Sequence, residues 1–423
     1  MRRMPRMKLH KLIFWLHLVA GVVAGTVICV MSVTGVMLAF EHQIVAFAER
    51  HARTAEPPAP SAPRLGPDAL LAKAREAAPE STPSGLILSA DPRAAAIINL
   101  GREQTILVDP YTGAVRHGAT TLRRFFHGVT DWHRWLGTHG ESREIGRAVT
   151  GACNAAFVVM VVSGFYLWWP RRWGRLALTA VTVPSLKLRG KPRDWNWHNA
   201  VGFWSAPALV LITLTGVVMS YQWANHLLYT LTGSEPPPLP QRPFAGTAGE
   251  GGVGRGGPDG RIGRGLPAPA SLDALVAAAT RQAPHWRRIS MRLPQPGSHQ
   301  ATVMIEEAQS RHPYPRSILT LDAATAAVVQ WEPYEGYNLG RTIRSWVRPV
   351  HTGEAGGLIG QTVAALASAG GAVLVYTGLA LAWRRFCQLV RRHRQGGRRR
   401  HDETRRHDAA REDPSRVSTK SLS

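Results

Sequence analysis

Two histidines interrupt long apolar runs at matching positions, and both are followed one helical turn later by glycine. His17 precedes Gly21, and His198 precedes Gly202, each in the pattern His-x-x-x-Gly. An ionisable side chain in an apolar helix is costly and marks a functional site, and histidine is the commonest transition-metal ligand. Imidazoles facing each other across a gap could hold haem iron from both sides, and the glycines leave room for a flat ring or close helix contact. The alternative is that each imidazole reaches the interface or bonds a neighbouring carbonyl.

A second pair of histidines is expected at the other end of the same runs. His351 opens the motif that leads into the last run, and His133 opens the motif before the second. His127 and His139 flank His133 six residues away on either side. Each of these motifs is followed by a Gly-Glu pair, at residues 140–141 and 353–354. Aligning the two pairs places His351 beside His139. The spacing alone therefore leaves the partner of His351 open between His133, which opens the matching motif, and its alternates His127 and His139.

Four apolar runs carry these motifs, and each is long enough to cross a bilayer. A hydrocarbon core of about 30 Å needs about 20 helical residues. The pattern predicts an α-helical membrane protein with four transmembrane helices. These are expected at residues 11–41, 146–170, 195–223 and 351–383, the last including an interfacial motif, with a further interfacial segment at 122–145. The first run lacks a clear cleavage site and is expected to remain as an anchor.

The formal charge of +23 is concentrated in three segments. These are residues 1–10, 171–194 and 384–423, and all three fall on one side if the chain crosses four times. The positive-inside rule then assigns both termini and the middle loop to the cytoplasmic side of the membrane. Contact with anionic lipid is expected for these segments, and a nucleic-acid partner is not.

The two outward loops resemble each other. Asp68 to Pro79 matches Asp273 to Pro284 without a gap, and each stretch predicts an amphipathic helix followed by β-type sequence. Residues 56–118 and 268–335 are therefore expected to form small α+β modules, with a Gly-rich linker at 244–267 before the second.

The spans repeat as well. Thr34-Gly35 matches Thr215-Gly216, and the stretch ending in Ser163-Gly164 matches that ending in Thr377-Gly378. The predicted fold is thus two parallel repeats of span, module and span, related by an axis along the membrane normal.

Several motifs together resemble the PepSY-associated transmembrane family, with PepSY-like modules as the outer, periplasmic segments. The motifs are Trp132 to Gly137, Ser163 to Arg171, Trp197 to Gly202 and His351 to Gln361, and the resemblance covers roughly residues 8–390. Members of this family include haem-containing ferrisiderophore reductases of the bacterial inner membrane and other proteins linked to iron uptake. The resemblance implies two b-type haems, one between His17 and His198 and one between His133 and His351.

The resemblance also implies the partners. No C-x-x-C-H motif for covalent haem and no flavin-binding domain occurs in the chain. The electron donor is therefore expected to be a separate reductase, reduced flavin or quinol, and the acceptor a ferric siderophore. His17 and His42 would lie about 37 Å apart on a continuous helix, so they would serve opposite surfaces.

Other side chains carry weaker expectations. Four arginines near the outer pair either bind haem propionates or are solvated: Arg134, Arg341, Arg344 and Arg348. Six histidines are expected on the surface: His10, His117, His226, His285, His299 and His312. The rival function is a non-enzymatic signalling or binding protein that uses its outer modules to bind a periplasmic partner. A transporter is disfavoured, because the apolar runs contain no acidic residue.

Overall fold

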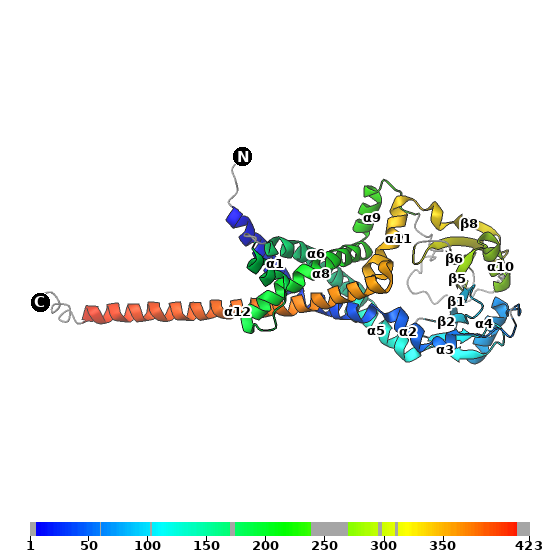
Figure 1. Ribbon diagram of the computed structural model, residues 1–423, viewed down its shortest axis with the longest axis horizontal. Helices are drawn as coiled ribbons and strands as arrows, with labels where there is room; N and C mark the ends of the chain where they lie inside the picture. The colour runs from blue at the N-terminus through cyan, green and yellow to red at the C-terminus, as the bar shows by residue number, and fades with distance from the viewer. Residues whose placement is uncertain are drawn as a thin grey trace, which may run out of the picture. The chain divides into compact units, whose positions relative to one another are not determined.

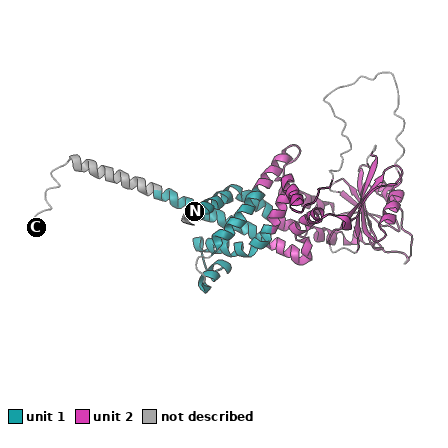
Figure 2. Ribbon diagram, turned by 90° about the horizontal axis from the view of Figure 1, so that it is seen from above, with its two compact units in different colours: residues 1–33, 153–210, 367–423 teal, residues 34–152, 211–366 magenta. Residues whose placement is uncertain are grey.

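The computed structural model describes residues 6–59, 61–101, 104–169, 174–237, 270–294, 298–308 and 312–412. The predicted Gly-rich linker at 244–267 lies outside these residues. The chain divides into two compact units, coloured separately in Figure 2. The first comprises Met1–Val33, Cys153–Val210 and Ala367–Ser423, and the second comprises Thr34–Ala152 and Leu211–Leu366.

Among the described residues, four helices are long and apolar enough to cross a membrane. They are α1 (Arg6–Leu38), α6 (Ser142–Trp168), α8 (Gly190–Ser220) and α12 (Gly357–Glu412), whose apolar part belongs to the candidate span Glu354–Arg392 (Figure 1). At most a third of the most apolar window of each span is buried within the protein. Large apolar side chains such as Val23, 78% exposed, therefore face outward and need a lipid environment. The chain is a multi-pass α-helical membrane protein.

In the first unit, small residues let the spans approach closely. A side chain added at Gly25 of α1 would meet Val375 and Leu379 of α12 at 3.5 and 3.6 Å. At Gly370 it would meet the Cβ of Ser205 on α8 at 3.0 Å. Small residues have this role between membrane helices, because they allow backbones to pack without intervening side chains.

A buried carboxylate joins two of these helices. Asp194 in α8 is 1% exposed. It forms ion pairs with Arg193 at 2.8 Å and with Arg384 of α12 at 3.1 Å. The short helix α7 (Arg175–Thr182) precedes α8. Asn196 of α8 donates to the Ala180 carbonyl at 2.7 Å and so holds the end of α7.

In the second unit, the described strands form one eight-stranded antiparallel sheet. Its order is β4-β3-β2-β1-β5-β6-β7-β8, so β1 and β5 join the two predicted modules at the centre. The strands are β1 (Pro83–Ser89), β2 (Ala96–Leu100), β3 (Gln104–Val108), β4 (Val115–His117), β5 (Trp286–Arg292), β6 (Gln300–Glu307), β7 (Arg316–Asp322) and β8 (Val328–Glu332).

Two helices cover one face of this sheet (Figure 1). They are α4 (Pro67–Ala77) and α10 (Leu272–Gln282), the two amphipathic stretches that the sequence matches. Leu70 of α4 and Leu275 of α10 join one core with alternate strand residues such as Leu86 and Ile289. Asp68 also caps α10, because its carboxylate accepts from the Leu272 and Asp273 amides at 3.2 and 3.1 Å.

The two halves of the sheet contain matching details. Extending the gapless match of Asp68 with Asp273 makes Leu86 equivalent to Met291, and these residues pair directly across β1 and β5. Further along each half, Asp109 and Asp322 open the same type of hairpin turn, in which each side chain accepts backbone N–H bonds. The turn has positive φ at Gly113 (73°) and at Ala326 (57°).

Seven shorter helical segments complete the second unit. They are α2 (Glu41–Ala48), α3 (Arg50–Arg53), α5 (Thr120–Trp135), α9 (Gln222–Leu231), η1 (Tyr334–Gly336), α11 (Leu339–Thr352) and η2 (Glu354–Gly356), all within the described residues. Buried Glu49 joins α3 to α5, because Arg53 and Arg123 both donate to it. Burial acts to raise the pKa of Glu49, but hydrogen bonds from Arg123, the Ala119 amide and Arg53 outweigh it and hold the pKa below its usual value.

Candidate functional site

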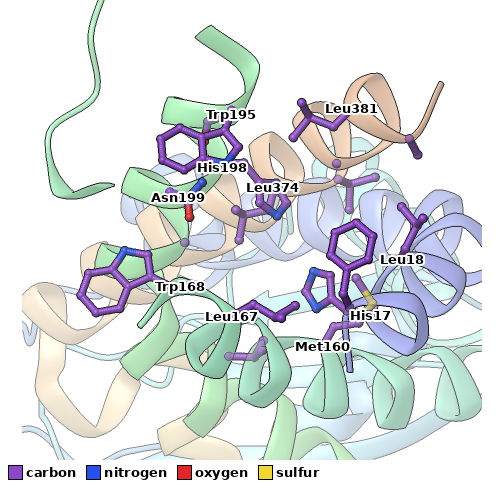
Figure 3. A pocket seen from close by; sticks show the side chains of 18 of the residues that line it. His17, Leu18, Met160, Leu167, Trp168, Trp195, His198, Asn199, Leu374 and Leu381 are labelled. Atoms are coloured by element: carbon purple, nitrogen blue, oxygen red, sulfur yellow. Dashed lines mark hydrogen bonds between the residues drawn. The ribbon is translucent and has the colours of Figure 1, made fainter. Parts of the chain in front are cut away.

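Two of the predicted histidines face the same cavity in the first unit. The cavity has a volume of about 430 Å³ and is lined by residues of α1, α6, α8 and α12. His17 of α1 and His198 of α8 both point into it (Figure 3). Their ring centroids are 6.3 Å apart, and the ring planes are at 89°. Gly21 and Gly202 line the same space.

A hydroxyl on the facing span orients each imidazole. His17 Nδ1 is 2.9 Å from Ser163 Oγ of α6, and Ser163 itself donates to the Met160 carbonyl at 3.2 Å. His198 Nδ1 is 3.0 Å from Thr377 Oγ1 of α12, which donates to the Val373 carbonyl at 2.8 Å. Because each hydroxyl hydrogen is used on a carbonyl, the hydroxyl oxygen accepts from Nδ1–H. This tautomer leaves a lone pair on Nε2, as a metal-ligating histidine requires.

A glycine beside each hydroxyl makes room for the ring. A Cβ added at Gly164 would lie 3.2 Å from His17 Cε1, and one added at Gly378 would lie 3.3 Å from His198 Cε1. Contacts this short would force the imidazoles to move. The Ser-Gly and Thr-Gly pairs therefore act together, since the first residue orients the ring and the second accommodates it.

The second unit holds another facing pair. His133 is in the last turn of α5 and His351 in the last turn of α11, with ring centroids 6.4 Å apart and planes at 67°. Thr34 Oγ1 is 2.9 Å from His133 Nδ1, and Thr215 Oγ1 is 3.1 Å from His351 Nδ1. His351 Nδ1 also donates to the Ile212 carbonyl at 2.8 Å, which selects the same tautomer as in the first pair.

The alternates to His133 lie elsewhere. His127 and His139 are both exposed, whereas His133 is half-buried. A separation of six residues rotates His127 by about 240° around α5, so it projects from a different face. His139 follows the left-handed residue Leu136 that ends α5. His42 is also largely exposed and lies 3.4 Å from Glu354.

Both imidazole spacings fit a single metal ion held between two nitrogens. A metal–imidazole bond is about 2.0 Å, and the bonded nitrogen is about 1.1 Å from its ring centre. Two rings on opposite sides of one ion thus have centres about 6.2 Å apart. The observed 6.3 and 6.4 Å agree with this value. Among the described residues no group of three or more His, Cys, Asp or Glu side chains could hold a bare ion. Two axial imidazoles are, however, all that haem takes from a protein in six-coordinate sites.

Three of the four arginines expected near the outer pair already have partners. Arg341 forms an ion pair with Glu332, and Arg344 donates to Asn225 Oδ1 at 2.8 Å. The Arg134 guanidinium stacks over Trp135, 4.5 Å from its ring centre. Arg348 precedes His351 by one turn of α11.

The prediction that His312 is a surface residue is wrong. Its side chain is buried between Tyr334 and Trp346, with ring centroids 5.2 and 4.5 Å away. Its Nδ1 accepts from the Tyr314 amide at 3.0 Å, and its Nε2 is 3.2 Å from Ser345 Oγ of α11. Burial lowers the pKa of His312, so the neutral form is favoured. The segment around it carries no apolar periodicity, which is why its packing on α11 was not foreseen.

The orienting hydroxyls were also not identified as functional from the sequence. In the sequence these hydroxyls mark only the repeat: Ser163, Thr377, Thr34 and Thr215. A signal was present, because Ser163 matches Thr377 and Thr34 matches Thr215 between the two repeats.

Comparison with protein families gives one match. The model of the PepSY-associated TM region matches residues 14–385. A comparison with curated proteins gave no match.

Proposed function

Because the chain belongs to the PepSY-associated transmembrane family, as its motifs predicted, we propose that it is a haem-b-containing membrane oxidoreductase. It moves electrons from the cytoplasmic side of the bacterial inner membrane to a ferric complex outside. The acceptor is a ferrisiderophore in iron uptake. The donor is a separate reductase, reduced flavin or quinol.

The proposal rests on one observation, the presence of two facing pairs of imidazoles. His17 with His198 and His133 with His351 have nearly the same spacing, and both spacings match axial ligation. Each ring is also oriented through Nδ1 by a hydroxyl. Such second-shell bonds orient metal-binding histidines and raise their basicity. A buried histidine that serves only packing needs neither a facing imidazole nor this tautomer.

The chemistry divides between cofactor and protein. Haem supplies one-electron transfer when bound. The protein would supply the imidazole nitrogens that hold it, the apolar cavity around the inner pair and the hydroxyls that set ring orientation. These features tune the reduction potential through ligand basicity and solvent exclusion.

The proposed direction follows from charge. Arg175, Lys187 and Arg189 lie between the second and third spans, and the sequence before the first span and after the fourth is also basic. The positive-inside rule makes these segments cytoplasmic, so the sheet domain is periplasmic. The proposed fold is two parallel repeats, each with its own PepSY-like module. His17 and His198 then serve the cytoplasmic side, and His133 and His351 the periplasmic side.

The test is the haem content of the purified full chain, produced in cells with ample haem. We expect about two extractable b-type haems per chain in the pyridine haemochrome assay. His17→Ala and His198→Ala should each remove the same haem, because each leaves a single axial ligand. His133→Ala and His351→Ala should each remove the other.

His226→Ala is the matched control, since this exposed histidine of α9 lies outside both pairs. It should retain both haems. Colourless wild-type protein would refute the proposal and favour a non-enzymatic binding role. Loss of different haems in His17→Ala and His198→Ala would refute the pairing.

A further inference from the structure

Three basic side chains line one end of the cavity that holds His17 and His198. They are His10 of α1, Lys191 of α8 and Arg385 of α12. His10 and Lys191 each precede the histidine of their own helix by two turns. Arg385 follows Gly378, where an added Cβ would lie 3.3 Å from His198 Cε1, by the same interval. Two turns correspond to about 10 Å along a helix axis. The three basic side chains therefore lie beyond the same edge of the space between the imidazoles.

The body of the cavity is apolar. Phe157, Met160, Val161 and Leu374 are among its lining residues, and the side chains of α6 in the lining are all uncharged. The cavity thus has an apolar interior, two facing imidazoles and a basic edge. A ligand that matches all three is flat and apolar, coordinates imidazole at its centre, and carries its negative charges along one side.

Lys191 and Arg385 have no carboxylate partner within ion-pair distance in the part of the chain that the structure describes. Their neighbours differ, because Arg384 and Arg193 both pair with buried Asp194. Arg385 instead lies over Phe14 and Trp15 of α1, with its guanidinium carbon 4.8 and 5.0 Å from the ring centres. These contacts hold the guanidinium at the edge of the cavity without neutralising it.

We propose that Lys191 and Arg385 bind the two propionate groups of the haem held by His17 and His198. This inference rests on the proposed function, because it assigns the orientation of the same cofactor. Two cationic side chains balance two carboxylates, and charge-assisted bonds of this kind are the strong ones. The propionate edge then faces the basic end of the spans, which is the side where a donor approaches under the proposed topology.

The test compares haem with its dimethyl ester, in which both propionates are neutral. Apoprotein is prepared from haem-limited cells as the full chain in detergent, and each ligand is titrated at constant ionic strength. Wild-type protein should bind haem at the inner site at least about tenfold more tightly than the diester, since bonds to charged groups are lost with the ester. In Lys191→Gln/Arg385→Gln this preference should disappear, while the bis-imidazole absorbance remains with the diester.

The matched control is Lys187→Gln/Arg391→Gln. It removes the same charge from nearby basic segments, but neither residue lines the cavity. This variant should keep the preference for haem and the wild-type midpoint potential. The Lys191→Gln/Arg385→Gln variant should show a lower potential, because uncompensated propionate charge favours ferric iron.

The two levels of failure are distinguishable. A preference for haem that survives in Lys191→Gln/Arg385→Gln, with an unchanged potential, would overturn the propionate assignment and leave the axial ligands untouched. Wild-type protein that binds neither haem nor its diester would overturn the proposed function itself.

Discussion

Removing the Ser163 hydroxyl tests whether the structure holds His17 ready for a metal. In Ser163→Ala the Nδ1–H of His17 loses its 2.9 Å acceptor, and the imidazole is free to rotate or to exchange tautomers. Nε2 is then presented to the cavity for only part of the time. We expect weaker haem binding and a higher midpoint potential, because an imidazole that no longer donates from Nδ1 is a weaker base and favours the ferric form less.

The size of the effect follows from the bond that is lost. A half-buried donor left without an acceptor costs about 1–3 kcal/mol. This corresponds to a loss of affinity of about 5- to 150-fold, which brackets the 10–100-fold typical of second-shell changes at metal sites. Thr377→Val should have an effect of the same size on His198, since its hydroxyl accepts at 3.0 Å in the same geometry.

The chain itself supplies the conservative control. Threonine occupies position 377 where serine occupies 163, so Ser163→Thr and Thr377→Ser should both retain wild-type haem affinity. Thr362→Val removes an exposed hydroxyl of α12 that bonds only the Leu358 carbonyl of its own helix, and it should change nothing. The readouts are haem titration and a spectroscopic redox titration. Equal losses in Ser163→Thr and Ser163→Ala would show that side-chain size matters there and not the hydrogen bond, and the reasoning would fail.

Three further predictions concern close packing, buried charge and backbone strain. Gly164→Val should abolish one haem, because its Cβ would lie 3.2 Å from the facing imidazole, whereas Gly128→Ala, with nothing within 4 Å, should leave haem content unchanged. Glu49→Ala should destabilise the full chain by about 2–4 kcal/mol, because it leaves two arginines unpaired. The lowered pKa of Glu49 means that its stabilisation is complete above pH 4.5 and is lost as the pH falls through the folded-state value. Glu49→Gln should therefore flatten the acid limb of thermal stability, and an unaltered limb would contradict this. Ala326→Gly should raise stability by about 0.5–1 kcal/mol and Gly113→Ala should lower it by about 1 kcal/mol, because both positions have positive φ; opposite signs in thermal unfolding would refute the strain argument.

The features that could be predicted from the sequence are those that local patterns encode. Apolar runs of sufficient length predicted the membrane helices, and the matched stretches beginning at Asp68 and Asp273 predicted α4 and α10. The pairing of His17 with His198 was inferred from a shared pattern, and the structure brings the two rings together. In each case the signal lies within about one helix length of sequence.

Features that depend on distant segments could not be predicted in the same way. Nothing local indicates that β1 pairs with β5, because an antiparallel edge contact between two modules has no periodicity of its own. The choice of His133 over His127 and His139 also lacked a local signal. It depends on which face of α5 contacts Thr34, and Thr34 lies 99 residues before His133 in the chain. His312 was misassigned for the same reason, since its partners on α11 are far away in sequence.

The orienting hydrogen bonds and the imidazole pairs are distributed differently over the two proposed repeats. Every orienting bond stays within one repeat, from His17 to Ser163 and from Thr34 to His133 in the first, and from His198 to Thr377 and from Thr215 to His351 in the second. Every imidazole pair, in contrast, takes one ring from each repeat. A single copy would therefore present correctly oriented imidazoles, but only one of the two imidazoles that each proposed haem would need. Under the proposed duplication, joining two such copies completes both sites at once, with ring centroids 6.3 Å apart in one pair and 6.4 Å apart in the other.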